Sequence, residues 1–562
     1  MASLPQAEFS ADADMLNNNN NSQIDVAYIS RLPLEVLICI LTEAACASAH
    51  CSEFGEYAAT WNVVEMQLVC RLWKEAIVSS PSLWSNIKTS MRITPDRFET
   101  LLKLSKPTPL DVVLTSASAP GRPIRVKRID ALLDVLDEEI HRLRSLEIVD
   151  GLGEMIRVTE SALFEKPLPR LESLTLDIGG RKIYEHGFRC VLNLAELFRS
   201  TSDTTTPLKR LRLRRAVPWP TNCFPNLTHL SISNAQPGSG GRLDPFAFLE
   251  FMRSSPNLVH LTLDTFGPIE CPPKRLAASM PNLREVRIRN TFWQAVVIVL
   301  GFCLVLPATA SVQVLSIDYG MSQNVLKWLL GPDAVYLRNA GAPRKLDLAL
   351  NGHTISVSWP GPSGSMELKL NAQLKPWLLE EFRHQWPTTA LTMLPRSLDL
   401  RDVEDLSLAM TTNANVPSRV MREFLLKMPN VRSCTVLLDP FIHRRYWTRC
   451  LLARNLSPTP FPHLQRLQLV RMHAGDSWIS TAAQIASLVA RRSLSDCDGL
   501  AELVCSTIRG PDLDPEATDA LTVGRCHVKE FVGSLKLEAI KRFPPLRAVL
   551  TTKLWDNAET RW

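Results

Sequence analysis

The side chains best suited to binding chemistry are arginines that alternate with leucines in PLKRLRLRR, residues 207–215. In an extended strand this alternation puts the leucines on one face and the arginines on the other. The outward set is Arg210, Arg212 and Arg214, and Arg287 and Arg289 occupy equivalent outward positions further along the chain. Because arginine pairs bidentately with carboxylate and phosphate, these residues predict a basic patch that binds an acidic or phosphorylated target. The alternative is a solvated strand face with ordinary charges.

Other reactive side chains form no pattern that predicts catalysis. Cys39, Cys46, His50 and Cys51 lack the paired close spacing of a structural zinc site. Neither a phosphate-binding loop nor a Gly-x-Ser-x-Gly elbow is present. We therefore expect no catalytic residue, no metal and no cofactor. A pocket with paired titratable groups of mutually shifted pKa would instead favour an enzyme on an α/β body.

Composition points to a folded protein that works inside the cell. The 562 residues are 45% apolar and 21% charged, which is ordinary for a soluble chain. A net charge of +6 spread over this length argues against nucleic acid as a partner. Thirteen cysteines without regular spacing indicate reduced thiols, and we expect the cytoplasm or the nucleus. The apolar stretch Ala295–Leu306 is shorter than the roughly 20 residues that span a bilayer, so we expect a buried helix and no membrane contact.

The first ordered elements are two apolar helices. LPLEVLICIL, residues 32–41, begins with a proline suited to a first helical turn, and its apolar residues cover nearly the whole circumference. We expect a second helix over Val63–Val78, ended by SSPS and followed by Leu83 and Trp84. A unit of about 55 residues cannot bury this much apolar surface alone, which predicts a docking surface for another protein.

The two stretches together resemble the F-box, in the variant abundant in the expanded families of mushroom-forming fungi. The matching residues are Leu32, Pro33, Glu35, Val69, Cys70, Arg71, Trp73, Pro81, Leu83 and Trp84. The resemblance covers residues 29–88 and implies binding to the Skp adaptor, and through it to a cullin, in a ubiquitin ligase. It assigns the adaptor contact to Leu32, Pro33, Val36, Ile40, Val69 and Trp73. The other interpretation is that several of these residues hold the helical unit together.

A different pattern begins near residue 140, where Leu-x-x-Leu-x-Leu recurs. Its strands are LRSLEI (143–148), LESLTL (171–176), LKRLRL (208–213), LTHLSI (227–232), LVHLTL (258–263), LREVRI (283–288), VQVLSI (312–317), VEDLSL (403–408), VRSCTV (431–436) and LQRLQL (464–469). Several follow a proline, as in FPNL, SPNL and MPNL. Helical candidates lie between them, in DPFAFLEFMRSSP (244–256) and SRVMREFLLKMP (418–429). Strand, helix and proline-led strand in repetition are typical of a solenoid, since no single unit can bury its leucines.

This body resembles the irregular leucine-rich repeats that follow F-boxes, although the asparagine or cysteine usual after the third leucine is missing. TISVSWPGPSGSMELKL (354–370) predicts a β-hairpin, and the segment after residue 475 has helical patterning, as in GLAELVCSTI. The expected fold is an α/β solenoid, in which a small all-α F-box precedes an irregular leucine-rich-repeat horseshoe. Its domains are a disordered leader at 1–28, the F-box-like domain at 29–88, a bridging segment at 89–140, and the repeats with degenerate C-terminal units and a cap at 141–562.

These features predict a non-catalytic substrate receptor of a Skp–cullin–F-box ubiquitin ligase. The F-box would bind the adaptor and the repeats would bind a target protein, whose identity the sequence does not give. The alternative is a protein-interaction scaffold outside any ligase, in which the F-box-like unit packs on its own repeats.

Overall fold

The computed structural model has an α/β fold, and the chain divides into two compact units. The structure describes residues 32–51, 63–90, 93–115, 126–150, 163, 166, 168–178, 207–214, 223–233, 245–265, 277–291, 293–307, 309–318, 329–331, 334, 337, 341–350, 354–360, 364–371, 385–410, 414, 416–438, 446, 450, 460–471, 502–507 and 547–548. Unit 1 comprises Met1–Leu192 and Glu196–Arg214, and unit 2 comprises Asn193–Ala195 and Arg215–Trp562. The description below treats each unit by itself.

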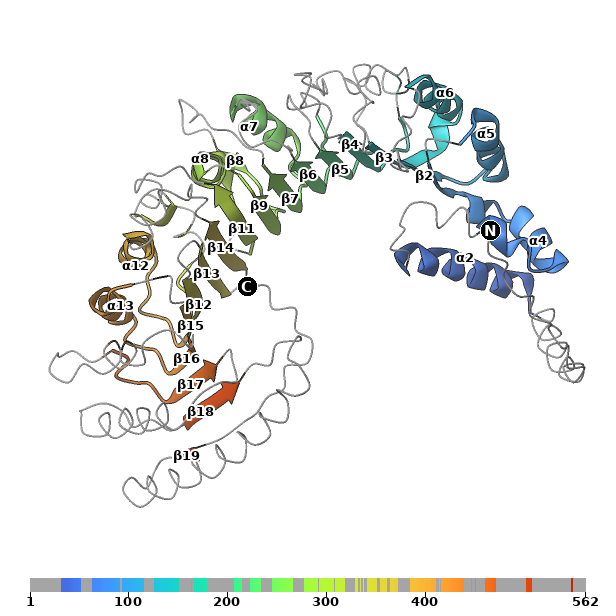
Figure 1. The fold of residues 1–562 in the computed structure, drawn as a ribbon. Coiled ribbons are helices and arrows are strands. Elements are labelled where there is room, and N and C mark those ends of the chain that lie inside the picture. Colours follow the sequence, from blue (N-terminus) through green and yellow to red (C-terminus); the bar gives the residue numbers. More distant parts are fainter. Residues whose placement is uncertain are drawn as a thin grey trace, which may run out of the picture. The chain divides into compact units, whose positions relative to one another are not determined.

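Unit 1 begins with helices and continues as a parallel sheet. Its elements are α2 (Leu34–Cys51), α4 (Arg71–Val78), η1 (Pro81–Trp84), β1 (Asn86–Ser90), α5 (Pro95–Leu104), β2 (Leu110–Thr115), α6 (Val126–Asp137), η2 (Ile140–Arg142), β3 (Leu143–Asp150), β4 (Ser173–Ile178) and β5 (Arg210–Arg214). The strands pair in chain order, all parallel, from β1 to β5. Figure 1 shows α5 and α6 on one face of this sheet. Residues 89–140, which we expected to bridge two domains, therefore contribute a strand and two helices to it.

Unit 2 holds a longer sheet with helices on one face (Figure 1). Its elements are β6 (His229–Ser233), α7 (Pro245–Ser254), β7 (His260–Asp264), β8 (Ala278–Ser279), β9 (Glu285–Arg289), α8 (Trp293–Ile298), the π-helical η7 (Val299–Cys303), β10 (Leu304–Val305), β11 (Ser311–Asp318), β12 (Lys345–Leu350), β13 (Thr354–Pro360), β14 (Ser365–Asn371), α12 (Gln385–Ser397), β15 (Asp405–Met410), α13 (Ser418–Leu425), β16 (Ser433–Leu438), β17 (Arg466–Arg471), β18 (Glu502–Thr507) and β19 (Arg547–Ala548). Among the residues that the structure describes, neither unit closes its sheet into a barrel.

Each expected Leu-x-x-Leu-x-Leu strand is present, and most begin two residues later than expected. The first leucine of the pattern closes a turn instead of opening the strand. In the turn before β7, Leu258 N donates to Ser255 O at 3.2 Å, with Pro256 at the second turn position that proline favours. The remaining leucines alternate inward along the strand, and Leu261 and Leu263 are fully buried. The proline therefore fixes a turn, and the turn sets the inward register of the strand.

The asparagines of the Pro-Asn-Leu turns join consecutive turns. Asn257 Nδ2 donates to Pro225 O at 2.9 Å, and Asn282 Nδ2 donates to Pro256 O at 3.2 Å. Asn282 also approaches Asn257 Oδ1 at 3.4 Å. The sequence lacks the usual asparagine after the third leucine, where the strand ends. In this chain, asparagines instead form hydrogen bonds between the turns that precede the strands.

The expected hairpin at 354–370 is confirmed, and it lies inside the sheet. Strands β13 and β14 pair antiparallel, and β13 also pairs antiparallel with β12. β14 then pairs in parallel with β11, while β12 pairs in parallel with β15. The local strand order is thus β11, β14, β13, β12, β15. Among the pairings that the structure describes in unit 2, those of β13 are the only antiparallel ones.

Three expectations from periodicity need correction. The helix expected over Val63–Val78 is broken: residues 63–66 form one helical turn, and α4 starts only after the extended Cys70. Within GLAELVCSTI, Glu502–Thr507 form strand β18 instead of a helix, because a short apolar run fits either structure and here pairs with β17. In DPFAFLEFMRSSP, the spacing of three predicts an inward face of Phe246, Leu249 and Met252; on α7, Leu249 and Met252 are buried, but Phe246 is exposed and Phe248 is buried in its place. The stretch Ala295–Leu306 is a buried helix as far as Cys303.

Candidate functional site: an apolar helical face and a basic strand

The helical part of unit 1 has a complete small core. α2 contributes Leu37 and Leu41, which are 1% and 0% exposed, and α4 contributes Ala76 and Ile77. The core is completed by Val63, Leu83 and Trp84, with Trp73 packed against it half-buried. The apolar residues of α2 that lie outside this core are thus not needed to close it.

Trp84 ties the end of α4 to the start of the sheet. Its Nε1 donates to Ile77 O at 2.8 Å, and both groups are buried. Ile77 O lies in the last turn of α4 and also accepts from Ser80 N at 3.3 Å, so the indole is its second partner. Pro81 starts η1 in a position where proline is favoured, and η1 leads directly into β1. The Pro-x-Leu-Trp motif is therefore the joint that fixes the helices to the sheet.

Val36 and Ile40, one turn apart, form an apolar face of α2 that is open to solvent, and Leu34, Leu68 and Val69 are exposed elsewhere on the helical part. The exposed fractions are 46% for Leu34, 44% for Val36, 46% for Ile40, 82% for Leu68 and 62% for Val69. The first three lie on α2, and the last two lie in the turn before α4. Exposure of large aliphatic residues in such a group is typical of a protein contact.

The structure separates the residues assigned to adaptor binding into two groups. Pro33, Val36, Ile40 and Val69 are exposed, whereas Leu32 and Trp73 are half-buried. The resemblance did not assign Leu34 and Leu68, although both are exposed. The signal for them was present, because each stands inside the same apolar run as an assigned residue.

Strand β5 has the alternation expected for the arginines. Leu211 and Leu213 are buried, while Arg210, Arg212 and Arg214 are exposed. Arg287 and Arg289 are half-buried residues of β9 in unit 2.

On β9, Arg287 has a carboxylate partner. Arg287 Nε donates to Glu285 Oε1 at 2.5 Å, and His260 Nδ1 lies 3.0 Å from Glu285 Oε2. Burial opposes ionisation of Glu285, but the hydrogen bonds from His260 and Arg287 outweigh it and lower its pKa. The His260 ring stacks on His229 with centroids 4.4 Å apart. Arg287 is therefore less available to an anionic ligand than the prediction assumed.

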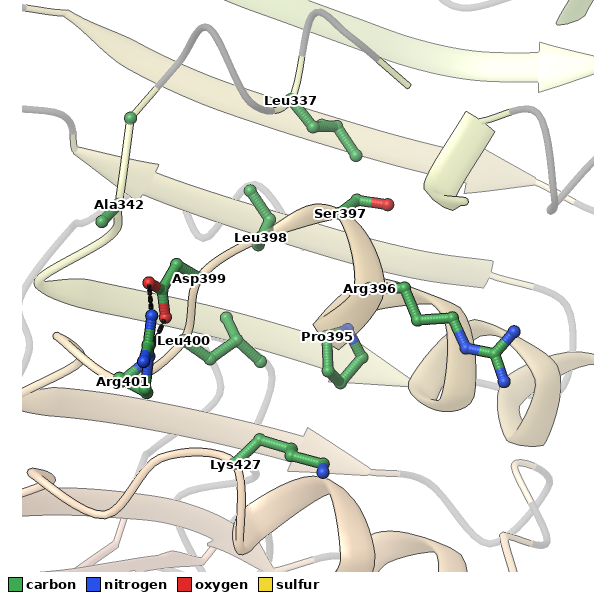
Figure 2. A pocket seen from close by; sticks show the side chains of 11 residues that line it. Leu337, Ala342, Pro395, Arg396, Ser397, Leu398, Asp399, Leu400, Arg401 and Lys427 are labelled. Atoms are coloured by element: carbon green, nitrogen blue, oxygen red, sulfur yellow. Dashed lines mark hydrogen bonds and ion pairs between the residues drawn. The ribbon is translucent and has the colours of Figure 1, made fainter. Parts of the chain in front are cut away.

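A cavity of about 490 Å³ lies beside the end of α12 (Figure 2). Its apolar lining includes the buried Leu398 and Leu400, with Arg396 and Lys427 exposed at the rim. Figure 2 shows Arg401 against Asp399, and its guanidinium donates to the two carboxylate oxygens at 2.9 and 2.6 Å. These bonds lower the pKa of Asp399 to about 2. The pair stays ionised at neutral pH, so it does not exchange protons there as a general acid or base would.

Within the described residues, no helix is both long and apolar enough to cross a membrane. In that same part of the chain, no three His, Cys, Asp or Glu side chains gather as metal ligands. Cys39, assigned above to no metal site, is exposed on α2, and the side chains of Cys46, His50 and Cys51 lie outside the described residues. The chain matches none of the family models and none of the curated proteins with which it was compared.

Proposed function

We propose that the chain is the substrate-recognition subunit of a Skp–cullin–F-box ubiquitin ligase, acting in the cytoplasm or nucleus. The Skp adaptor would bind the open apolar face, and a target protein would bind the sheet of an irregular leucine-rich-repeat solenoid. The subunit would carry no chemistry itself. Its effect would be proximity, because holding a target beside a charged enzyme raises the effective concentration.

The observation that carries this proposal is the exposure of Val36 and Ile40, one turn apart on a helix whose other side is already buried through Leu37 and Leu41. α2 thus has one apolar side for its own core and a second side with no core to join. The match of the flanking residues to the F-box pattern, from Leu32 to Trp84, supplies the identity of the partner.

The solenoid part of the proposal has separate support. In both units, a turn is followed by a parallel strand with inward leucines, and this sequence of elements repeats. In unit 2, hydrogen bonds from asparagines join consecutive turns. The helices that the structure describes beside the unit 2 sheet lie on one face, which leaves the other face to the exposed strand residues. An open strand face of this kind suits capture of a protein segment.

The test is co-expression of the full chain with a Skp adaptor, followed by purification through a tag on the adaptor. We expect the double change Val36→Asp, Ile40→Asp to abolish co-purification, because two charges would be buried in an apolar contact. The matched control is Phe246→Asp, which changes a 43% exposed apolar residue on α7. Wild-type chain that fails to co-purify, or a double variant that binds like wild type, would favour the non-ligase scaffold instead.

A further inference from the structure

Strands β4 and β5 set their outward side chains opposite one another in register. Thr175 stands opposite Arg212, and Asp177 stands opposite Arg214. Arg214 Nη1 donates to Asp177 Oδ2 at 2.6 Å, which neutralises this end of the strand. Cross-strand pairs of opposite charge are the ordinary way to accommodate a charged strand face.

The other end of β5 is neutralised in the same manner. Lys209 Nζ donates to Glu172 Oε1 at 3.0 Å. Between the two ion pairs, the cross-strand neighbour of Arg210 is Ser173, and that of Arg212 is Thr175. Asp177 of β4 thus pairs with Arg214, and Glu172 just before β4 pairs with Lys209 just before β5. The two inner arginines of β5 have only hydroxyls opposite them on β4.

Neither inner arginine forms an ion pair within the part of the chain that the structure describes. The next carboxylate in the row of Arg212 is Glu147 on β3, which is two strands away and therefore roughly 9.6 Å distant at the backbone. Arg210 and Arg212 are both exposed and lie two residues apart on one face, about 6.6–6.8 Å along the strand. Two like charges at this distance repel each other, and an anion bound between or over them would remove that repulsion.

We propose that Arg210 and Arg212 bind an extended acidic segment of a partner protein, with carboxylates at positions i and i+2. An extended chain turns its i and i+2 side chains to the same face with the same spacing as the arginines. Each carboxylate then receives a bidentate guanidinium contact, and the hydroxyls of Ser173 and Thr175 lie beside them as further donors. This inference rests on the proposed function only in naming the partner as the target; the binding itself needs no adaptor.

The experiment measures fluorescence anisotropy of labelled peptides with the full-length chain. The probe is Thr-Glu-Thr-Glu-Thr, its isomer Thr-Glu-Glu-Thr-Thr keeps the charge but not the spacing, and a third peptide has phosphoserine in place of both glutamates. We expect the first peptide to bind and the isomer to bind at least about tenfold more weakly. Equal binding of the two isomers would overturn the proposed strand geometry.

The chain offers a charge-matched control in the same strand. The double change Arg210→Gln, Arg212→Gln should weaken binding of the probe at least about tenfold, whereas Lys209→Gln, Arg214→Gln removes equal charge from paired groups and should weaken it less than about twofold. If both double variants lose the same affinity for the probe, the effect depends only on total charge, and the assignment of the site to Arg210 and Arg212 is overturned. Binding of the phosphoserine peptide without the glutamate peptide would overturn carboxylates as the ligand.

Failure of this proposal and failure of the adaptor proposal are distinguishable. The peptides are added without adaptor, so a negative anisotropy result leaves co-purification with the adaptor as it was. Conversely, the Arg210→Gln, Arg212→Gln chain should co-purify with the adaptor like wild type, because the changes lie far along the sequence from α2 and α4.

Discussion

Replacing Arg142 by methionine should loosen the joint between the helices and the sheet of unit 1. The Arg142 side chain is 5% exposed and precedes β3. Its guanidinium donates to Ser105 O at 2.7 Å, to Thr108 O at 3.0 Å and to Glu139 Oε2 at 2.9 Å. Thr108 in turn donates to Pro81 O at 3.3 Å, in the η1 turn that carries Trp84. One arginine therefore connects α5, the loop after it and the Pro-x-Leu-Trp joint.

The expected cost is about 3–5 kcal/mol, the usual effect of removing one partner from a buried ion pair. Thr108 O loses both of its bonds from the guanidinium, and a buried acceptor left unpaired costs about 1–3 kcal/mol. Ser105 O keeps the bond from Thr108 N at 2.9 Å, so its loss is smaller. Glu139 keeps its contact with Lys106 at 2.6 Å, which limits the total. Methionine preserves much of the side-chain volume, so a cavity contributes little.

The assay is native-state hydrogen exchange of β2 and β3, which reports the local free energy of opening. The control is Arg144→Met, two residues away, where a half-exposed arginine pairs with Asp111; it should cost about 0–1 kcal/mol. If Arg142→Met lowers the opening free energy by no more than the control, the network does not hold the joint and the reasoning is refuted.

The same network gives a pH signature. Burial opposes ionisation of Glu139, but bonds from Lys106 and Arg142 outweigh it and lower its pKa. The unfolded chain then binds more protons than the folded one, so the stability contribution is complete above the unfolded value of about 4.3 and is lost as pH falls through the folded pKa. Arg142→Met removes one of these bonds, and its acid dependence below about pH 4.3 should be weaker than that of wild type.

Two further changes test the joints between elements. Asn257→Ala removes the bond to Pro225 O and the acceptor for Asn282, and should lower the free energy of unfolding in urea by about 0.5–1.5 kcal/mol; an unchanged value would contradict the bridging of turns. Trp84→Phe keeps a buried ring but removes the indole bond to Ile77 O, which then keeps only the 3.3 Å bond from Ser80 N, and should lower the free energy of opening of α4 by about 0.5–1.5 kcal/mol in hydrogen exchange. Unaltered protection of α4 would show that the indole bond is dispensable.

The strands of this chain follow from its sequence because their pattern is local. Two buried leucines at alternate positions, after a proline turn, specify an inward face whatever lies beside it. Even there, the pattern wrongly places the first leucine in the strand. Leu258 closes a turn through its hydrogen bond to Ser255 O, and only this bond distinguishes a turn residue from a strand residue. The bonds from Asn257 and Asn282 were less accessible, since each joins segments 25 or more residues apart. The recurrence of Pro-Asn-Leu was the available signal.

Strand order was not predictable in the same way. The turn residues of 354–370 specify a hairpin. They do not specify that β14 pairs with β11 or that β12 pairs with β15. That choice depends on interactions between strands far apart in the sequence, which periodicity does not contain. The break at Cys70 has a similar origin, because the apolar spacing of residues 63–78 continues through a turn that exposes Leu68 and Val69.

For the site residues too, local properties follow from the sequence and properties that depend on strand pairing do not. Outward exposure of Arg210 and Arg212 follows from alternation with leucine, but their lack of a carboxylate neighbour follows from the register with β4. A register shift of two residues would place Asp177 opposite Arg212 and remove the proposed site, with no change in the sequence of β5. Ion pairing across strands therefore decides which of several identical arginines is available to a ligand, and the register that decides it is set by the turns before β4 and β5.

The substrate receptor that we propose would hold two partners at a fixed separation, so its two sites would have to be joined by stiff structure. In unit 1 the path from α2 to the sheet passes through the Trp84 bond to α4, the Thr108 bond to Pro81 and the buried Arg142. The bonds of Trp84 and Arg142 are buried and that of Thr108 is part-buried, which makes opening of the joint costly. A scaffold without such a requirement would tolerate a flexible joint. Loss of target ubiquitylation by Arg142→Met in a chain that still binds both partners would therefore separate rigid presentation from mere attachment.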